Sequence, residues 1–238
     1  MKLSLNRNQI KYIAIIAMVI DHIAWHWVPT TTLLGQVMHF IGRLTGPLMA
    51  IMIADGYQYT RDLKKYALRL AIFAVLSWPA YSLNAYGTWP LFGIDTFGVI
   101  YTLFLGLMAI CIWDRTKLPK AAKVTLVVLL CILSLFGDWP IFDVLWPLFL
   151  FIYRDDKKAK WTSFAIIVAV ECGILIFFDA LSGNPFANIF QLGAFMVIPL
   201  YLYVYNGESG SKHPFHKWFF YAFYPAHLLV LYFLYWKM

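Results

Sequence analysis

Charged residues are scarce in this sequence. They make up 13% of its 238 residues, whereas hydrophobic residues make up 62%. A soluble domain carries about 25% charged residues, and its mean hydropathy normally lies well below the +0.69 of this chain. The scarcity of charge excludes a soluble globular protein and leaves no segment for a large soluble domain. We therefore predict an integral membrane protein that contacts the lipid bilayer and binds no nucleic acid.

Cysteine is rarer still, with three residues that all fall inside apolar runs. They form no Cys-x-x-Cys pair or other metal spacing, and they carry no information about disulfides. The chain shows no internal repeat and no inverted pair of broken helices of the kind found in many secondary transporters. These absences favour a single transmembrane domain over residues 1–238 and give no reason to expect a bound metal ion.

Apolar runs fill most of the chain and are separated by charged or Pro/Gly-rich breaks. A helix rises 1.5 Å per residue, so about 20 apolar residues can cross the hydrocarbon core. The runs predict an all-α polytopic fold with about nine transmembrane helices, at residues 10–28, 33–54, 65–85, 97–113, 121–137, 139–153, 161–180, 187–205 and 217–236. The sixth is the weakest, because it begins with Trp139-Pro140, and it is either tilted, broken or re-entrant.

Basic residues alternate with the predicted helices. All of the 19 Lys and Arg residues except Arg43 and Lys237 lie on one side of the membrane if the chain crosses it nine times. Short cytoplasmic loops are enriched in Lys and Arg, so this side is expected to be cytoplasmic. The rule predicts a cytoplasmic N-terminus, which carries Lys2, and a C-terminus outside.

A few ionisable side chains interrupt the apolar runs. Asp21 and His22 lie in the first predicted helix and Arg43 in the second. An ionisable group in hydrocarbon costs several kcal/mol unless it is paired or hydrated, so such residues usually face a bundle interior where they serve a function. Counting along the helices places His22 about 9 Å, Arg43 about 15 Å, and His227 and Glu171 about 13 Å below the outer surface. The sequence thus indicates chemistry or transport in the outer half of the membrane.

Helical spacing shows which of these residues share a face. His22 and His26 are four residues apart, as are His39 and Arg43, so each pair shares a face, and a pocket results if the two faces meet. Asp21 and His22 diverge by about 100° around their helix, so Asp21 is not expected to orient His22. Arg43 is the better partner for Asp21. The two histidines of the first pair lack the further ligands that a metal site requires.

Two other acidic residues lie near the ends of predicted helices. Asp143 and Asp179 are close enough to the membrane surface to be solvated. A solvated carboxylate needs no buried partner. We therefore interpret both as structural.

Several short motifs follow one another along the chain. They are IDHI at 20–23, GRL at 42–44 followed by Pro47, YALRL at 66–70, YTL at 101–103 and FYPAHL at 223–228. In this order and combination the motifs resemble the TraX family of membrane acetyltransferases, which is related more distantly to the acyltransferase-3 superfamily. The similarity runs from end to end of the chain.

This resemblance implies transfer of an acetyl group from acetyl-CoA to an amine. The family's named member N-acetylates the amino terminus of a conjugative pilin in the inner membrane. The acceptor expected here is an amine at the outer face: a pilin-like peptide, another exported peptide, an amino sugar or a lipid head group. The expected location is the bacterial cytoplasmic (inner) membrane.

The implied chemistry suggests roles for the intramembrane residues. An amine is mostly protonated at neutral pH and cannot attack a thioester until it loses a proton, so a base is needed, and His22 is the predicted base. Arg43 or Tyr224 would stabilise the oxyanion, and Asp21 would balance the charge of the cluster. Substrate contacts are predicted for His227, Tyr224, Tyr101, Thr102, His39 and Glu171. The polyanionic acetyl-CoA is expected to bind basic residues on the cytoplasmic side, especially Arg61, Lys64, Lys65 and Arg69.

Three alternatives stay open at this point. The acetyl group passes either directly to the acceptor or through a covalent acetyl-histidine at His22. Intramembrane Asp, Glu and His residues also form proton relays, so a proton-coupled transporter or flippase is the main competing function. A structural partner of an envelope complex is the third, and it predicts that His22→Ala leaves the phenotype intact.

Overall fold

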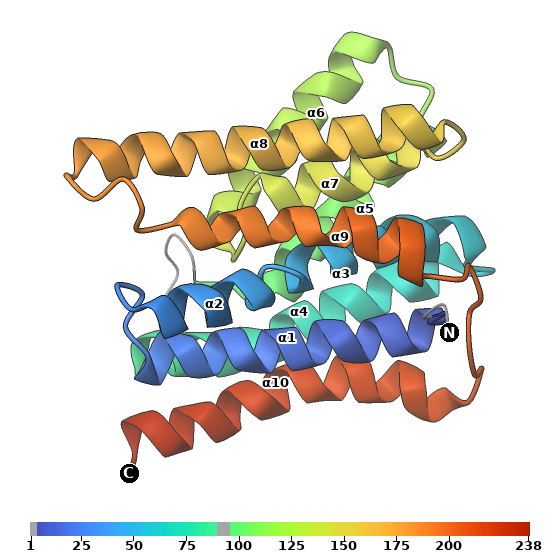
Figure 1. Ribbon diagram of the computed structural model, residues 1–238. Helices are drawn as coiled ribbons and strands as arrows, with labels where there is room; N and C mark the ends of the chain where they lie inside the picture. Colours follow the sequence, from blue (N-terminus) through green and yellow to red (C-terminus); the bar gives the residue numbers. More distant parts are fainter. Residues whose placement is uncertain (1–3, 90–95) are drawn as a thin grey trace. The chain divides into compact units, whose positions relative to one another are not determined.

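The computed structural model describes residues 4–89 and 96–238, without the side chain of Lys217. Its described elements are all helical, and these residues form no strand (Figure 1). Lys2, one of the basic residues behind the predicted orientation, lies outside the described residues. The elements are α1 (Arg7–Trp27), α2 (Leu33–Gly42), α3 (Thr45–Tyr59), α4 (Leu63–Tyr86), α5 (Val99–Arg115), α6 (Lys120–Leu133), η1 (Ser134–Phe136), α7 (Phe142–Ile152), α8 (Lys157–Leu181), η2 (Ile189–Met196), α9 (Val197–Pro199), η3 (Leu200–Val204) and α10 (Pro214–Trp236).

Helical segments occupy the predicted places, but they do not support nine spans. Within the described residues, five helices are long and apolar enough to cross a membrane: Arg7–Trp27, Leu33–Tyr59, Leu63–Tyr86, Lys157–Leu181 and Pro214–Trp236. Other predicted spans are cut short by turns. The predicted helix 121–137 gives way to the 3₁₀ turn η1 and Gly137, and the next one, α7, begins only after Pro140. The described chain is an all-helical membrane protein with five candidate spans.

The predicted helix 33–54 is interrupted after Gly42. Arg43 and Leu44 form a turn, and α3 begins at Thr45. Pro47 has no N–H to bond the carbonyl of Arg43, and in the first turn of α3 it is tolerated because that N–H has no partner within the helix in any case. The interruption makes Arg43 the C-cap of α2, and its side chain extends from there to α1.

Side-chain caps fix the starts of the two helices that carry the predicted catalytic residues. Asn6 accepts a hydrogen bond from the N–H of Gln9 at 3.1 Å, and the Gln9 side chain accepts one from the N–H of Asn6 at 2.9 Å. This capping box satisfies two of the unpaired N–H groups at the start of α1. Thr32 caps α2 by accepting from the N–H of Gly35 at 3.0 Å. The caps therefore set the register at which α1 and α2 present their polar residues.

The helices group into two compact units, each built from segments that are distant in sequence. Unit 1 comprises Met1–Met49 and Trp161–Phe219, and within it α1 lies beside α2 and α2 beside η2 (Figure 1). Unit 2 comprises Ala50–Lys160 and Phe220–Met238, and within it α5 packs against α4, α6 and α7. The intramembrane Asp21, His22 and Arg43 all belong to unit 1.

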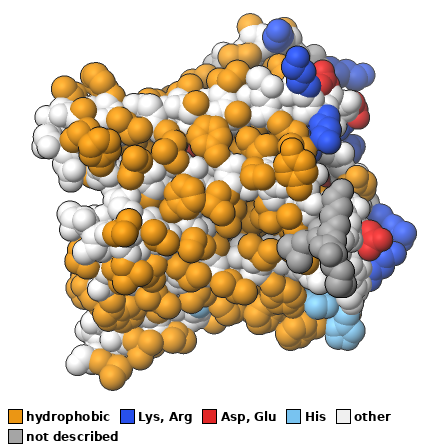
Figure 2. All heavy atoms as spheres, viewed as in Figure 1, with side chains coloured by type: hydrophobic (Ala, Val, Ile, Leu, Met, Phe, Trp, Pro, Cys, Tyr) orange, Lys and Arg blue, Asp and Glu red, His pale blue; other side chains and the backbone are white. Residues whose placement is uncertain are grey.

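One face of α8 has the character expected of a surface in contact with lipid. Ile166, Val170 and Ile174 recur every four residues and are each about half exposed, and Phe177 continues the stripe. The other face of the helix buries Glu171 among apolar residues. Figure 2 shows hydrophobic side chains covering much of the face in view. A stripe of exposed aliphatic residues suits hydrocarbon and would be costly in water.

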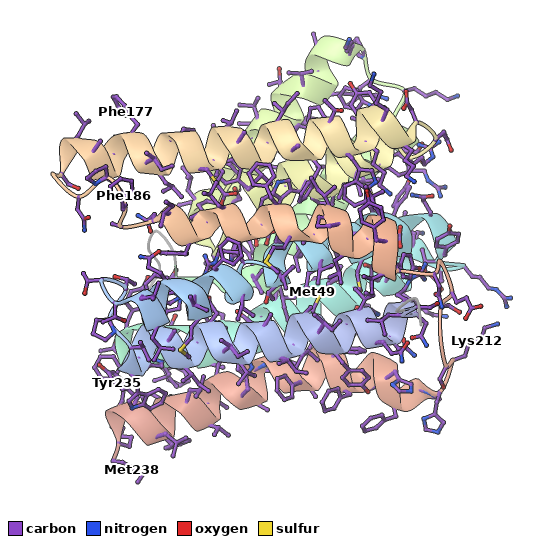
Figure 3. All side chains as sticks on the ribbon, viewed as in Figure 1. Met49, Phe177, Phe186, Lys212, Tyr235 and Met238 are labelled. Atoms are coloured by element: carbon purple, nitrogen blue, oxygen red, sulfur yellow. The ribbon has the colours of Figure 1, made fainter. Side chains whose placement is uncertain are left out.

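The two ends of unit 1 differ in character. Phe186 lies in the connection after α8 and is 68% exposed, whereas Lys212 lies in the connection before α10, and Figure 3 shows them at opposite ends of the unit. Asp179 closes the first of these connections, since its carboxylate accepts hydrogen bonds from the N–H and the side-chain amide of Asn188, each at 2.9 Å. The sequence predicts a solvated Asp179, but the structure buries it. Its hydrogen bonds to Asn188 agree with the predicted structural role.

Candidate active site

The carboxylate of Asp21 joins α1 to α2 in the interior of unit 1. Its Oδ1 lies 2.8 Å from Nδ1 of His39, and its Oδ2 accepts a hydrogen bond of 2.6 Å from Nη2 of Arg43. All three residues are buried, with His39 fully so. A buried charge costs several kcal/mol unless it is paired, so the ion pair between Asp21 and Arg43 is what makes this position tolerable for either group. The predicted pairing of Asp21 with Arg43 is confirmed.

A glycine allows the two helices to approach this closely. A Cβ atom added at Gly42 would lie 2.4 Å from Cβ and Oδ1 of Asp21, where ordinary contacts are 3.4–4 Å. The backbone of α2 therefore lies directly against the Asp21 side chain. The Gly-Arg pair in the sequence has a geometric explanation, because the glycine admits the carboxylate that the next residue binds.

Aromatic rings surround the cluster. Trp25 lies one turn after Asp21 on α1, and its indole N–H donates to Oδ2 of Asp21 at 3.2 Å. The ring centroid of His39 lies 4.3 Å from that of Trp25 and 4.9 Å from that of Phe190 in η2. The guanidinium of Arg43 lies over the Phe190 ring at 5.2 Å. These contacts restrict the orientation of the imidazole and guanidinium groups and keep the surroundings apolar, which strengthens the electrostatic interactions inside.

The hydrogen bond to Asp21 determines which nitrogen of neutral His39 carries the proton. Nδ1 faces a carboxylate, so it is the protonated nitrogen and donates, and Nε2 keeps its lone pair. Among the described residues, Nε2 of His39 is buried and has no hydrogen-bond partner. An imidazole held by a carboxylate on one nitrogen, with the other nitrogen available to accept a proton, is the arrangement of a general base.

Further polar groups of unit 1 lie around Arg43. Its Nη1 donates to Oε1 of Gln191 at 3.4 Å. Glu171 in α8 is buried and interacts electrostatically with Arg43. The predicted residue Glu171 therefore belongs to the surroundings of the cluster, and Gln191 was not predicted.

His22, the predicted base, lies beside this cluster on α1 and is half-buried. Asp21 and His22 interact electrostatically, as expected of sequence neighbours. The residue that Asp21 orients by a hydrogen bond is His39, which the sequence placed among the substrate contacts. The catalytic role of His22 stays a prediction, but the geometry of a carboxylate-held imidazole is found at His39.

The remaining predicted substrate contacts lie in unit 2. The Tyr224 hydroxyl accepts a hydrogen bond from the N–H of Val99 at 3.2 Å, close to the start of α5. Thr102 is buried and donates to Oδ2 of Asp143 at 3.0 Å. Asp143 is also buried, whereas the sequence predicts that it is solvated. The Tyr101 hydroxyl donates to the carbonyl of Leu133.

His227 is also buried, and Nδ1 of its ring bonds the carbonyl of Phe223 at 3.1 Å, one turn earlier in α10. Its ring stacks on that of Phe223. These contacts and those of Tyr224, Thr102 and Tyr101 fix the side chains within unit 2. Their predicted roles toward a substrate stay predictions.

The four basic residues predicted to bind acetyl-CoA are at the start of α4. Arg61, Lys64 and Lys65 are exposed, and Arg69 is half-buried with its guanidinium 5.8 Å from the ring centroid of Tyr66. Asp62 caps the helix by accepting from the N–H of Lys65 at 3.0 Å. This hydrogen bond, reinforced by the Lys65 ammonium, lowers the pKa of Asp62 below its usual 3.8. The exposed cations are placed where an anionic ligand can reach them.

The chain is similar to known proteins over nearly its whole length. The family model described as "TraX protein" matches residues 6–235. A curated relative, "Probable fimbrial assembly protein FimC, serogroup H1" from Dichelobacter nodosus, is 32% identical over 232 residues, which cover 94% of this chain and 93% of the relative. No solved structure matches the chain significantly. The motifs at Asp21 and Arg43, the end-to-end family match and the fimbrial relative together establish that the chain belongs to the TraX family.

Proposed function

We propose that this protein is a membrane-embedded acetyltransferase that moves an acetyl group from acetyl-CoA to the amino terminus of an exported, pilin-like peptide. The observation that carries the proposal is His39, whose Nδ1 is held by the buried Asp21 and whose Nε2 has no partner among the described residues. Family membership supports acetyl transfer, and the fimbrial assembly relative supports a pilin-like acceptor.

In the proposed reaction His39 accepts the proton that the acceptor amine loses. The amine nitrogen attacks the thioester carbonyl, a C–N bond forms, the C–S bond breaks, and the CoA thiolate leaves with the proton that the imidazolium returns. Asp21 stabilises the imidazolium while it carries the proton, as a carboxylate does in a catalytic triad. Such a base contributes about 10²- to 10⁴-fold to a rate.

Arg43 is proposed to serve the same step in a second way. Its Nη2 neutralises Asp21, and the positive charge of the guanidinium stabilises the oxyanion that forms on the thioester carbonyl. Because the site is buried and lined by aromatic rings, water screens this charge weakly. Tyr224 and His22 are kept as further candidates, and each is tested below by its own variant.

Acetyl-CoA is proposed to enter from the cytoplasm, where it is made. The exposed cations Arg61, Lys64 and Lys65 suit its polyanionic nucleotide end. The proposal keeps a cytoplasmic N-terminus and an outer C-terminus, and the bias of Lys and Arg along the sequence is its ground. We accordingly propose the bacterial cytoplasmic membrane as the location and an exported peptide as the acceptor.

The test uses the purified full-length protein with acetyl-CoA labelled in the acetyl group and a synthetic peptide bearing a free amino terminus. Mass spectrometry measures the acetylated peptide, and a thiol reagent measures released CoA. We expect transfer by the wild-type protein and loss of transfer in His39→Gln and Arg43→Ala proteins that still elute as folded species. His22→Ala and Tyr224→Phe tell whether those residues contribute as well.

One result would overturn the proposal. If the wild-type protein in vesicles moves a solute in response to a proton gradient and never consumes acetyl-CoA, then the buried Asp and His residues serve a proton-coupled transporter. Labelled His39 or His22 peptide after incubation with acetyl-CoA alone would instead support the acetyl-histidine route, in which transfer takes two steps.

A further inference from the structure

Gln36 lies on the same face of α2 as His39 and Arg43, because it precedes His39 by three residues and Arg43 by seven. Its side-chain amide donates at 2.7 Å to the carbonyl of Thr30 and at 3.0 Å to the carbonyl of Ala187. Both N–H groups of the amide are therefore used by the two connections that meet at this end of unit 1. Because a carbonyl only accepts, these bonds also fix which atom of the amide is the oxygen.

The amide oxygen of Gln36 is left as an acceptor. Among the described residues, its Oε1 is buried and has no hydrogen-bond partner, like Nε2 of His39 one turn further along the helix. Most buried polar atoms are paired, since an unpaired one costs free energy. Two unpaired acceptors on one helix face, about 5–6 Å apart at their Cβ atoms, match a ligand that presents two hydrogen-bond donors close together.

The first residue of a peptide presents such a pair. Its terminal amine and the N–H of the first peptide bond lie within a few ångströms of each other, and a peptide N–H donates without accepting. We propose that Gln36 is a specificity residue that accepts the hydrogen bond of the first peptide N–H while His39 receives the proton of the amine. This inference rests on the proposed acetyl transfer to a peptide amine. An amino sugar offers hydroxyl groups beside its amine, which accept as well as donate and suit two acceptors less well.

The decisive experiment changes the acceptor and leaves the protein intact. Two peptides of the same sequence are compared with the wild-type protein, one with an ordinary first peptide bond and one in which its N–H is replaced by an ester oxygen. Losing this donor leaves Gln36 Oε1 unpaired, so we expect KM for the ester to be about tenfold higher or more. The hydrogen bond is made in the ground state as well as the transition state, so kcat should change little.

A protein variant completes the test. Gln36→Met keeps the length of the side chain and removes its acceptor, so this variant should bind the ordinary peptide more weakly and no longer distinguish it from the ester. The matched control is Gln58→Met, because Gln58 is exposed on α3; this variant should retain the wild-type preference. If Gln36→Met does not fold, the comparison of the two acceptors with the wild-type protein decides alone.

The outcomes separate this inference from the function on which it rests. Transfer to both peptides with equal KM would overturn the role of Gln36 and leave acetyl transfer standing. Transfer to glucosamine and to neither peptide would overturn the peptide acceptor and the role of Gln36 together. Absence of transfer to any amine would overturn the proposed function itself.

Discussion

Replacing Gly42 with alanine tests the contact between α1 and α2 on which the Asp21 cluster depends. The added Cβ would lie 2.4 Å from the Asp21 side chain, and ordinary contacts begin at 3.4 Å. Asp21 or the α2 backbone must therefore move by about 1 Å, as judged from close packing in protein interiors. Hydrogen bonds of 2.8 Å to His39 and 2.6 Å to Arg43 would then lengthen to about 3.6 Å or more, where they are lost.

Two effects should follow from Gly42→Ala. A misplacement of about 1 Å in a catalytic group lowers a rate about a hundredfold, so acetyl transfer should fall by at least that factor. Overpacking of this kind lowers the free energy of unfolding by about 1–3 kcal/mol. Both are measured on the same detergent-purified protein, the rate from acetylated peptide and the stability from thermal unfolding followed by tryptophan fluorescence.

Gly173→Ala is the matched control within the same unit. Gly173 lies in α8, and no atom lies within 4 Å of a Cβ added there. Alanine is favoured over glycine in a helix by up to about 1 kcal/mol, so this variant should unfold at the same temperature or slightly higher and keep its activity. If Gly42→Ala behaves like Gly173→Ala in both measurements, α2 does not lie against Asp21 and the described site is wrong.

Two further predictions concern other parts of the fold. Gly193→Ala would place a Cβ 2.0 Å from the carbonyl oxygen of Phe40, so η2 must move away from α2. We expect the free energy of unfolding, measured by thermal unfolding, to fall by about 1–3 kcal/mol. An unchanged unfolding temperature would contradict this packing. The pKa of Asp62 is lowered in the folded state, so its cap on α4 stabilises the helix above the ordinary value of 3.8 and is lost as the pH falls through the folded pKa. Hydrogen exchange at the amide of Lys65, which donates to Asp62, should therefore lose protection relative to its intrinsic rate as the pH falls through that range. Protection that stays as high as that of amides in the middle of α4 would contradict the cap.

Much of the fold follows from the periodicity of the sequence. Every predicted helix has a helical counterpart, because long apolar runs between charged or Pro/Gly breaks have few other ways to satisfy their backbone groups in lipid. The prediction of nine spans is not supported, because composition alone does not show where turns shorten a helix. Pro47 was visible in the sequence, but its consequence, a turn at Arg43 instead of a continuous helix, depends on the packing of Arg43 against α1.

The candidate site was predictable in part. Asp21 and Arg43 were paired correctly, because a buried carboxylate needs a cation and the next helix offers one. The sequence could not decide which histidine Asp21 holds, since that depends on which faces of α1 and α2 meet. The sequence spacing does indicate Trp25, which follows Asp21 by four residues, and Gln36, which shares the face of α2 with His39, as neighbours of the cluster. Phe190 and Gln191 come from a segment that is distant in sequence, so no spacing pattern indicates that they lie near Asp21.

The measurement that tests the central claim most directly compares the acetyl-transfer rates of His39→Gln, Asp21→Asn and the double variant Asp21→Asn/His39→Gln in one assay. If Asp21 acts through His39, the His39→Gln variant should lose about 10²- to 10⁴-fold, and the double variant should lose clearly less than the product of the two single losses, because residues that act as a unit do not contribute additively. A His39→Gln protein that transfers acetyl at the wild-type rate, or a double variant whose loss is the product of the two single losses, would contradict the account.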